Sequence, residues 1–206
     1  MIGLSGSHRV GKTTLAKRYS EEFGLPFVET NASGVYLELG LSPQIDYDFA
    51  TTLVIQLAIL ESLLEAYAGQ HGRNFITDRT PIDLLAYTMA DIRRSNVTSK
   101  ETDAFMEYRQ KCFEAANRYF AVIVIVQPGI PLVDDPTKAP PNIAYMNHIN
   151  TLLMGLVTDS SMKAGRFFIN KETLKIEDRM DSISYSIDRV YNHHKNEMTN
   201  LGGSFH

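Results

Sequence analysis

Residues 1–14 read Met-Ile-Gly-Leu-Ser-Gly-Ser-His-Arg-Val-Gly-Lys-Thr-Thr, and they contain the most specific motif of the chain. Within it, residues 6–13 match the pattern G-x-x-x-x-G-K-[ST], the P-loop that binds phosphate groups. Residues 1–5 are apolar enough for a buried strand, and residues 14–23 have the pattern of an amphipathic helix. A strand, a glycine-containing loop and a helix form the context that a P-loop requires.

The P-loop predicts how the chain binds a nucleotide. Its glycines allow backbone N–H groups to point at a phosphate, and the helix N-terminus adds partial positive charge. Lys12 can reach the β- and γ-phosphates, and the hydroxyl of Thr13 can bind Mg²⁺. We therefore expect ATP and Mg²⁺ as cofactors. The predicted nucleotide-binding residues are Gly6, Ser7, His8, Val10, Gly11, Lys12, Thr13 and Thr14.

The composition is that of an ordinary globular protein with one domain. The chain has 206 residues and a formal net charge of −4, so no global basic field favours nucleic acid, although a local basic groove is compatible with that charge. The single cysteine, Cys112, fits a reducing compartment, and we expect a cytoplasmic protein without a signal peptide. The longest apolar stretch, 53–60, is shorter than the roughly 20 residues of a membrane span, so we expect no membrane contact.

Strands and helices alternate along the chain, which predicts an α/β fold with helices on both faces of a parallel sheet. Apolar and β-branched runs predict strands at 1–5, 27–29, 74–78, 121–126 and 166–169. Helical patterns lie at 12–22, 35–39, 48–67, 80–89, 98–120, 142–158 and 171–195. The proline-rich segment 127–141 has no period and is typical of a lid. We expect one domain at 1–195 and a flexible tail at 196–206.

A second candidate site is Asp78-Arg79, which follows the third predicted strand. Carboxyl ends of parallel strands share one edge of a sheet, so these side chains should lie near the P-loop. Asp78 could order Mg²⁺ or accept a proton from an attacking hydroxyl, and Arg79 could bind a phosphate; a structural ion pair is the alternative. Asp83, three residues after Thr80, is better explained as a helix cap than as an acceptor ligand.

These motifs resemble those of a known family. Residues 6–14, with an arginine inside the loop, resemble the P-loop of thymidylate kinases, and residues 75–87 resemble their Asp-Arg motif and the helix after it. Strand order and spacing also match that family and its relatives, the deoxynucleoside kinases and phage deoxynucleotide kinases. The resemblance implies a three-layer P-loop NTPase fold in which the five parallel strands have the order 2-3-1-4-5.

The resemblance also implies the catalytic roles. Lys12 would hold the donor phosphates, Thr13 and Asp78 would bind the metal, and Arg79 would serve the acceptor side. Arg9 would neutralise charge on the migrating phosphoryl group, because residues 119–165, which include the predicted lid, contain no arginine. A solvent-facing loop residue is the alternative for Arg9.

The acceptor pocket should lie between the long helix 48–67 and the helix after Asp78. Aromatic side chains, Tyr47 among them, could stack on a base there, although core packing explains them better. Gln56 interrupts an apolar run without a local reason, and a contact with the base would explain it as well as core packing. The lid resembles that of phage P-loop kinases and ribosylnicotinamide kinase. The candidate substrate-binding residues are Gln56, Phe49, Tyr87, Asp83, Asp135 and Lys138.

Two departures from the family concern the acceptor. His8 stands where relatives often have an acid, and the second strand ends in residues 29–31, Glu-Thr-Asn, where an arginine commonly binds the acceptor phosphate. We expect a kinase that acts on a nucleotide-type acceptor, first of all a thymidylate-like deoxynucleoside monophosphate. One alternative is phosphorylation of 5-hydroxymethyluracil in DNA, and another is a nucleotide-dependent regulatory ATPase. A homodimer is compatible with the sequence.

Overall fold

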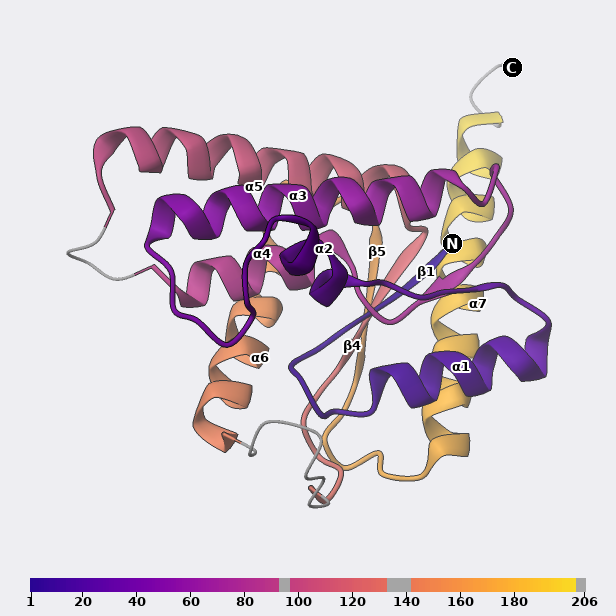
Figure 1. Cartoon of the computed structure of the whole chain (residues 1–206). Coiled ribbons are helices and arrows are strands. Elements are labelled where there is room, and N and C mark those ends of the chain that lie inside the picture. The colour runs from indigo at the N-terminus through magenta and orange to yellow at the C-terminus, as the bar shows by residue number, and fades with distance from the viewer. Residues whose placement is uncertain (93–96, 133–141, 203–206) are drawn as a thin grey trace.

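A computed structural model describes residues 1–92, 97–132 and 142–202, and Figure 1 shows the arrangement of its elements. Five strands form one sheet, all parallel, in the order β2-β3-β1-β4-β5. The strands are β1 (Ile2–Ser5), β2 (Phe27–Val28), β3 (Ile76–Thr77), β4 (Val122–Val126) and β5 (Gly165–Ile169). This topology confirms the predicted fold class and strand order.

Helices cover both faces of the sheet, which makes three layers (Figure 1). The helices are α1 (Lys12–Phe23), α2 (Ala32–Glu38), α3 (Phe49–Ala68), α4 (Pro81–Ala90), α5 (Ser99–Tyr119), α6 (Ile143–Thr158) and α7 (Ile176–Gly202). α1 and α7 pack on one face, whereas α3, α4 and α5 pack on the other. Each face has its own hydrophobic cluster, so the sheet is buried on both sides.

The central strand β4 shows why its sequence is apolar at every position. Ile123 and Ile125 point into the cluster under α3, α4 and α5, and Val122, Val124 and Val126 point into the cluster under α1 and α7. All five side chains are buried. Successive side chains of a strand point to opposite faces, so a strand between two helical layers needs no polar position.

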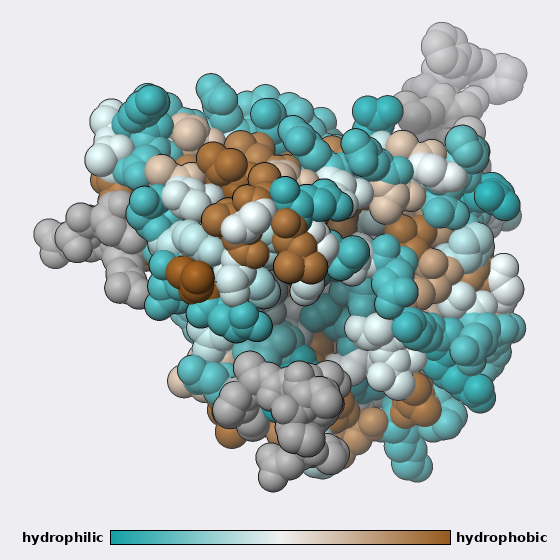
Figure 2. Space-filling view, in the orientation of Figure 1, coloured by the Kyte–Doolittle hydropathy of each residue, from teal (hydrophilic) through white to brown (hydrophobic). Residues whose placement is uncertain are grey.

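Among the described residues, α3 is the one helix whose length and composition would allow it to cross a membrane, with a mean hydropathy of 1.5. The bounds of α3 agree with the predicted helix 48–67, and its apolar character extends beyond the stretch 53–60. Its buried side chains, such as Leu53, Ile59 and Leu63, pack in the cluster shared with α4 and α5. Figure 2 shows hydrophobic residues gathered over α2 and α3, where Leu37 and Val54 are exposed.

Some predicted boundaries differ from the structure, and two predicted segments lie partly outside the described residues. α7 starts at Ile176 and not near residue 171, because residues 170–175 form a turn in which Thr173 N–H donates to Asn170 O (3.0 Å). The helix continues to Gly202, past the predicted end near residue 195. Within the predicted lid 127–141, residues 133–141 lie outside the described residues, and so do residues 203–206 of the predicted tail.

Candidate functional site

The P-loop joins β1 to α1, and two of its glycines are required by its geometry. A Cβ on Gly6 would lie 2.6 Å from the backbone oxygen of Val126, so no larger residue fits beside β4. Gly11 has φ 85°, in the left-handed region that favours glycine. Arg9 also has a positive φ, 62°, although it is not glycine. The loop backbone thus holds Arg9 in a conformation that costs free energy.

Lys12 folds back into the loop. Its Nζ donates to Gly6 O (2.6 Å) and Ser7 O (2.8 Å). Burial lowers the pKa of Lys12, while Asp83 and Asp78 raise it. The ammonium group therefore lies inside the cradle, in the position from which it can contact phosphate oxygens.

Thr13 and Asp78 meet beside the P-loop, as the sheet topology requires. Thr13 lies in the first turn of α1, Asp78 follows β3, and the Thr13 hydroxyl donates a hydrogen bond to Asp78 Oδ2. A hydroxyl and a carboxylate are oxygen ligands of the kind that Mg²⁺ takes alongside phosphate oxygens and water. The residues present therefore fit the metal, and no group of three or more His, Cys, Asp or Glu side chains gathers within the described residues.

Asp83 is buried beneath the P-loop. It is 1% exposed, and Thr80 N–H and the Thr80 hydroxyl donate to its Oδ2 at 2.9 and 3.0 Å. Its Oδ1 accepts from Gly6 N–H (3.0 Å), and Thr80 also pairs with Ser5 Oγ (2.7 Å). The capping box of α4 thus ties β1 and the P-loop to the Asp-Arg motif. This confirms the capping role that the sequence favoured for Asp83 and corrects its listing as a candidate acceptor ligand.

A cavity of about 700 Å³ opens next to His8 and Arg9, between α3, α4 and α6. Gln56, from α3, is 8% exposed, and its Oε1 has no hydrogen-bond partner among the described residues. Buried polar groups are normally paired, so an unpaired oxygen on a residue that lines a cavity is unusual. The lining residues are His8, Arg9, Ala32, Tyr36, Pro43, Gln56, Ile59, Arg79, Leu84, Tyr87, Asp91, Asn142 and Tyr145.

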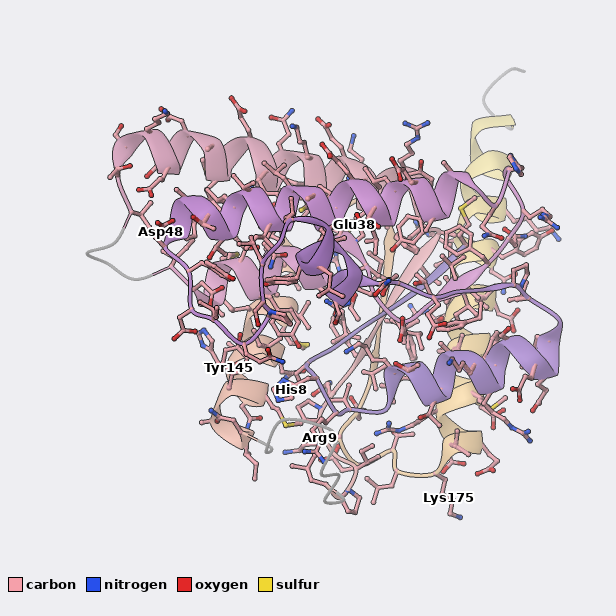
Figure 3. All side chains as sticks on the ribbon, viewed as in Figure 1. His8, Arg9, Glu38, Asp48, Tyr145 and Lys175 are labelled. Carbon is pink, nitrogen blue, oxygen red and sulfur yellow. The ribbon has the colours of Figure 1, made fainter. Side chains whose placement is uncertain are left out.

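Aromatic rings line one side of this cavity. Tyr145 lies 5.8 Å from His8 and 6.3 Å from Tyr87, ring centroid to centroid, and Figure 3 shows His8 and Tyr145 next to each other. Burial raises the pKa of Tyr87, so its hydroxyl stays protonated. Burial, and then the charges of Lys12 and Arg9, lower the pKa of His8. The imidazole is therefore neutral at pH 7.

Five predicted residues line this one cavity: His8, Arg9, Gln56, Arg79 and Tyr87. Phe49 does not: it is 3% exposed and packs against Phe105, so its predicted contact with the acceptor is corrected to core packing. Tyr47 also lies outside the lining, where its hydroxyl accepts from Ser42 N–H (3.0 Å). Asp135 and Lys138 lie outside the described residues.

Several lining residues were missed because the sequence does not show which helix face meets the P-loop. They are Tyr36, Asp91, Asn142 and Tyr145. The one available signal was position, since Asn142 and Tyr145 open a helix that directly follows the predicted lid. The backbone of Arg79 is held by α3, because Tyr67 Oη donates a hydrogen bond to the carbonyl oxygen of Arg79 (2.6 Å).

Comparisons with known proteins agree with this architecture. Among solved structures, deoxyadenosine kinase from M. mycoides with bound dATP has a TM-score of 0.64 and 13% identity, and the match covers 91% of this chain and 98% of that one. NadR protein in complex with NR has a TM-score of 0.62 and 14% identity, and the match covers 90% of this chain and 50% of that one. At these identities the likeness shows the fold, which is that of P-loop kinases. No curated protein matches the chain. A model of the AAA domain family matches residues 1–159, so the chain belongs to the AAA domain family.

Proposed function

We propose that this protein transfers the γ-phosphoryl group of ATP, with Mg²⁺, to a nucleoside-type acceptor bound in the cavity beside the P-loop. The observation that carries the proposal is the unpaired Oε1 of Gln56, buried at one side of a cavity that reaches Arg9 of the P-loop. A nucleobase has N–H groups at its edge that can donate to such an oxygen. A cavity of about 700 Å³ is in the usual range for ligands of this size.

The side chains divide the work of phosphoryl transfer, which is mostly positioning and charge neutralisation. Lys12 and the loop amides hold the donor phosphates. Thr13 and Asp78 would hold Mg²⁺, which neutralises charge on the phosphate oxygens when it is bound. Arg9 and Arg79 both line the cavity, so they face the acceptor and the migrating group.

An acceptor without a 5′-phosphate is favoured over a monophosphate. The end of β2 carries Glu29, Thr30 and Asn31, which line a neighbouring cavity of about 220 Å³ without an arginine. The similar deoxyadenosine kinase is named for a nucleoside substrate, and the NadR structure holds NR. We therefore place a nucleoside first and a thymidylate-like monophosphate, with Arg79 on its phosphate, second.

Phosphorylation of 5-hydroxymethyluracil in DNA is the third acceptor to test. A base in a duplex would have to leave the stack to enter this cavity. Salt-sensitive retention of duplex DNA by the purified protein would support that acceptor. A regulatory ATPase is the remaining alternative, and it needs no occupant for the Gln56 cavity.

The test is a screen of ADP release with ATP and Mg²⁺. Nucleosides, nucleoside monophosphates and DNA that contains 5-hydroxymethyluracil are offered in parallel, and Lys12→Ala serves as the blank. We expect a nucleoside to stimulate ADP release at least about tenfold over the rate without acceptor. ATP turnover that no acceptor stimulates would overturn the kinase proposal in favour of the ATPase.

A further inference from the structure

Arg179, near the start of α7, is a buried arginine for which the proposed phosphoryl transfer supplies no role. Its side chain is 3% exposed. Its Nε donates to Thr173 O (2.7 Å), and its Nη1 donates to Val10 O (3.0 Å). One side chain thus joins the P-loop to the turn 170–175 that precedes α7.

The charge of Arg179 has no counter-charge within the described part of the chain. No ion pair given for those residues includes it, and its buried Nη2 has no hydrogen-bond partner there. Burial lowers the pKa of the guanidinium, and no carboxylate opposes that shift. A buried cation without an anion costs several kcal/mol. Because this uncompensated cation lies next to a phosphate-binding loop, we infer that the missing anion is a bound ligand.

The geometry of transfer places the donor on the Arg179 side of the loop. The acceptor cavity contacts His8 and Arg9, whereas a Cβ on the next glycine, Gly11, would lie 3.6 Å from Arg179 Nη1 and 3.2 Å from Ile130 Cδ1. The attacking and leaving oxygens lie roughly in line in phosphoryl transfer, so donor and acceptor approach from opposite sides. Figure 3 shows the same order, with Tyr145 and His8 on one side of Arg9 and Lys175, next to α7, on the other.

We propose that Arg179 is a positioning residue of the ATP site, which holds the Val10–Gly11 turn in its phosphate-binding conformation and supplies a buried positive charge that the donor phosphates compensate. The proposal rests on the proposed function only for the identity of the donor. It predicts that substitution of Arg179 weakens ATP binding without slowing the phosphoryl-transfer step. In a site of low dielectric constant, a charge held behind one loop of backbone still acts on a bound phosphate.

The test compares Arg179→Met with Arg179→Lys. Methionine keeps much of the side-chain length but removes the charge and the hydrogen-bond donors, whereas lysine keeps the charge and loses the fork of donors. We expect Arg179→Met to raise the Kd for the ATP analogue AMP-PNP at least about tenfold, while kcat at saturating ATP changes less than about threefold. Arg179→Lys should recover part of the affinity.

Thermal unfolding separates this role from a merely structural one. The ligand-free Arg179→Met protein should unfold within a few degrees of the wild type, because the lost hydrogen bonds are offset by relief of an uncompensated buried charge. The rise in Tm that AMP-PNP causes should shrink. Arg189→Met, an exposed arginine on the same helix, is the matched control and should change neither quantity.

Two results would overturn the proposal. One is a large loss of stability in Arg179→Met with an unchanged Kd for AMP-PNP, which would make Arg179 a structural strut. The other, if the methionine variant does not fold, is an Arg179→Gln protein, which also lacks the charge, with wild-type affinity for AMP-PNP. A wild-type protein that binds AMP-PNP but phosphorylates no acceptor would refute the proposed function and leave the assignment of Arg179 intact.

Discussion

At the scale of single residues, Arg9 shows how the loop backbone directs a side chain. A φ of 62° costs a residue with a Cβ about 1–2 kcal/mol, and the closed loop maintains it. Strain of this kind gathers at functional sites, and here the strained residue lines the acceptor cavity. Substitutions at this position can therefore separate stability from catalysis. The backbone conformation favours glycine, whereas the proposed chemistry requires arginine.

We predict that Arg9→Ala and Arg9→Gly both lower kcat at least about 100-fold, because the charge on the migrating phosphoryl group is no longer neutralised. The Kd for ATP should stay within about threefold. Arg9→Gly should be about 1 kcal/mol more stable than Arg9→Ala in urea unfolding, because glycine adopts the positive φ without strain. Equal losses of ATP binding and turnover would show that Arg9 is a donor-phosphate contact alone.

Gln56 permits a matching experiment on the acceptor side. Gln56→Leu removes a buried oxygen that has no partner and keeps most of the volume, so stability should be unchanged or slightly higher. The KM for the acceptor should rise at least about tenfold, with the Kd for ATP unaltered. Val54→Leu, at an exposed position of the same helix, is the control. An unchanged acceptor KM in Gln56→Leu would remove Gln56 from the site.

At the scale of elements, the capping box at the start of α4 also supports the P-loop. Asp83→Ala leaves the buried N–H groups of Gly6 and Thr80 unpaired, so we predict a loss of about 3 kcal/mol in unfolding free energy and weaker ATP binding. The capping box of α5, formed by Thr98 and Glu101, is exposed and distant from the loop. Glu101→Ala should cost about 1 kcal/mol or less and leave ATP binding unchanged. Similar effects of Asp83→Ala and Glu101→Ala on ATP affinity would show that the capping box of α4 does not support the P-loop.

The segments that follow β4 and β5 pack closely against each other at Gly129 and Lys171. A Cβ on Gly129 would overlap the backbone carbonyl of Lys171, whereas a Cβ on Gly155, in α6, would meet nothing within 4 Å. We predict that Gly129→Ala lowers Tm by several degrees, because one of the two backbones must move. Gly155→Ala should raise unfolding free energy by about 0.5–1 kcal/mol through helix propensity. Differential scanning calorimetry of both variants checks the pair, and a Gly129→Ala protein with wild-type Tm would contradict the packing.

At the scale of the whole molecule, the dependence of stability on pH should include a contribution from the P-loop. The pKa of His8 in the folded protein lies below its ordinary value of 6.5, so the unfolded chain takes up the proton first as the pH falls. Stability linked to His8 is therefore present above pH 6.5 and is lost as the pH falls toward the folded pKa.

We predict that unfolding free energy, measured by urea between pH 7.5 and 5.5, falls more steeply in the wild type than in His8→Gln. His148→Gln, an exposed histidine of α6, should retain the wild-type slope. Parallel slopes for the wild type and His8→Gln would mean that the P-loop surroundings do not penalise the imidazolium.

Most helices and strands, and their succession along the chain, can be predicted from the sequence. The P-loop, the start of α4 at Thr80 and the strand 122–126 each carry their signal within a few neighbouring residues, and apolar strands that alternate with helices leave few other sheets to build. The positions of Lys12, Thr13 and Asp78 followed as well, because the carboxyl ends of parallel strands share an edge.

The tertiary structure alone decided which side chains close the cavity and which charge lies behind the loop. Tyr36 and Tyr145 line the cavity beside the P-loop from α2 and α6, and Arg179 donates to the loop from α7. Phe49, predicted beside the acceptor, is buried in the core. A helical pattern shows that one face is apolar, but the rotation of that helix depends on packing against distant segments. The difference lies in sequence separation. Strand and helix signals come from neighbouring residues, whereas a cavity is formed by contacts between segments that are far apart in the chain.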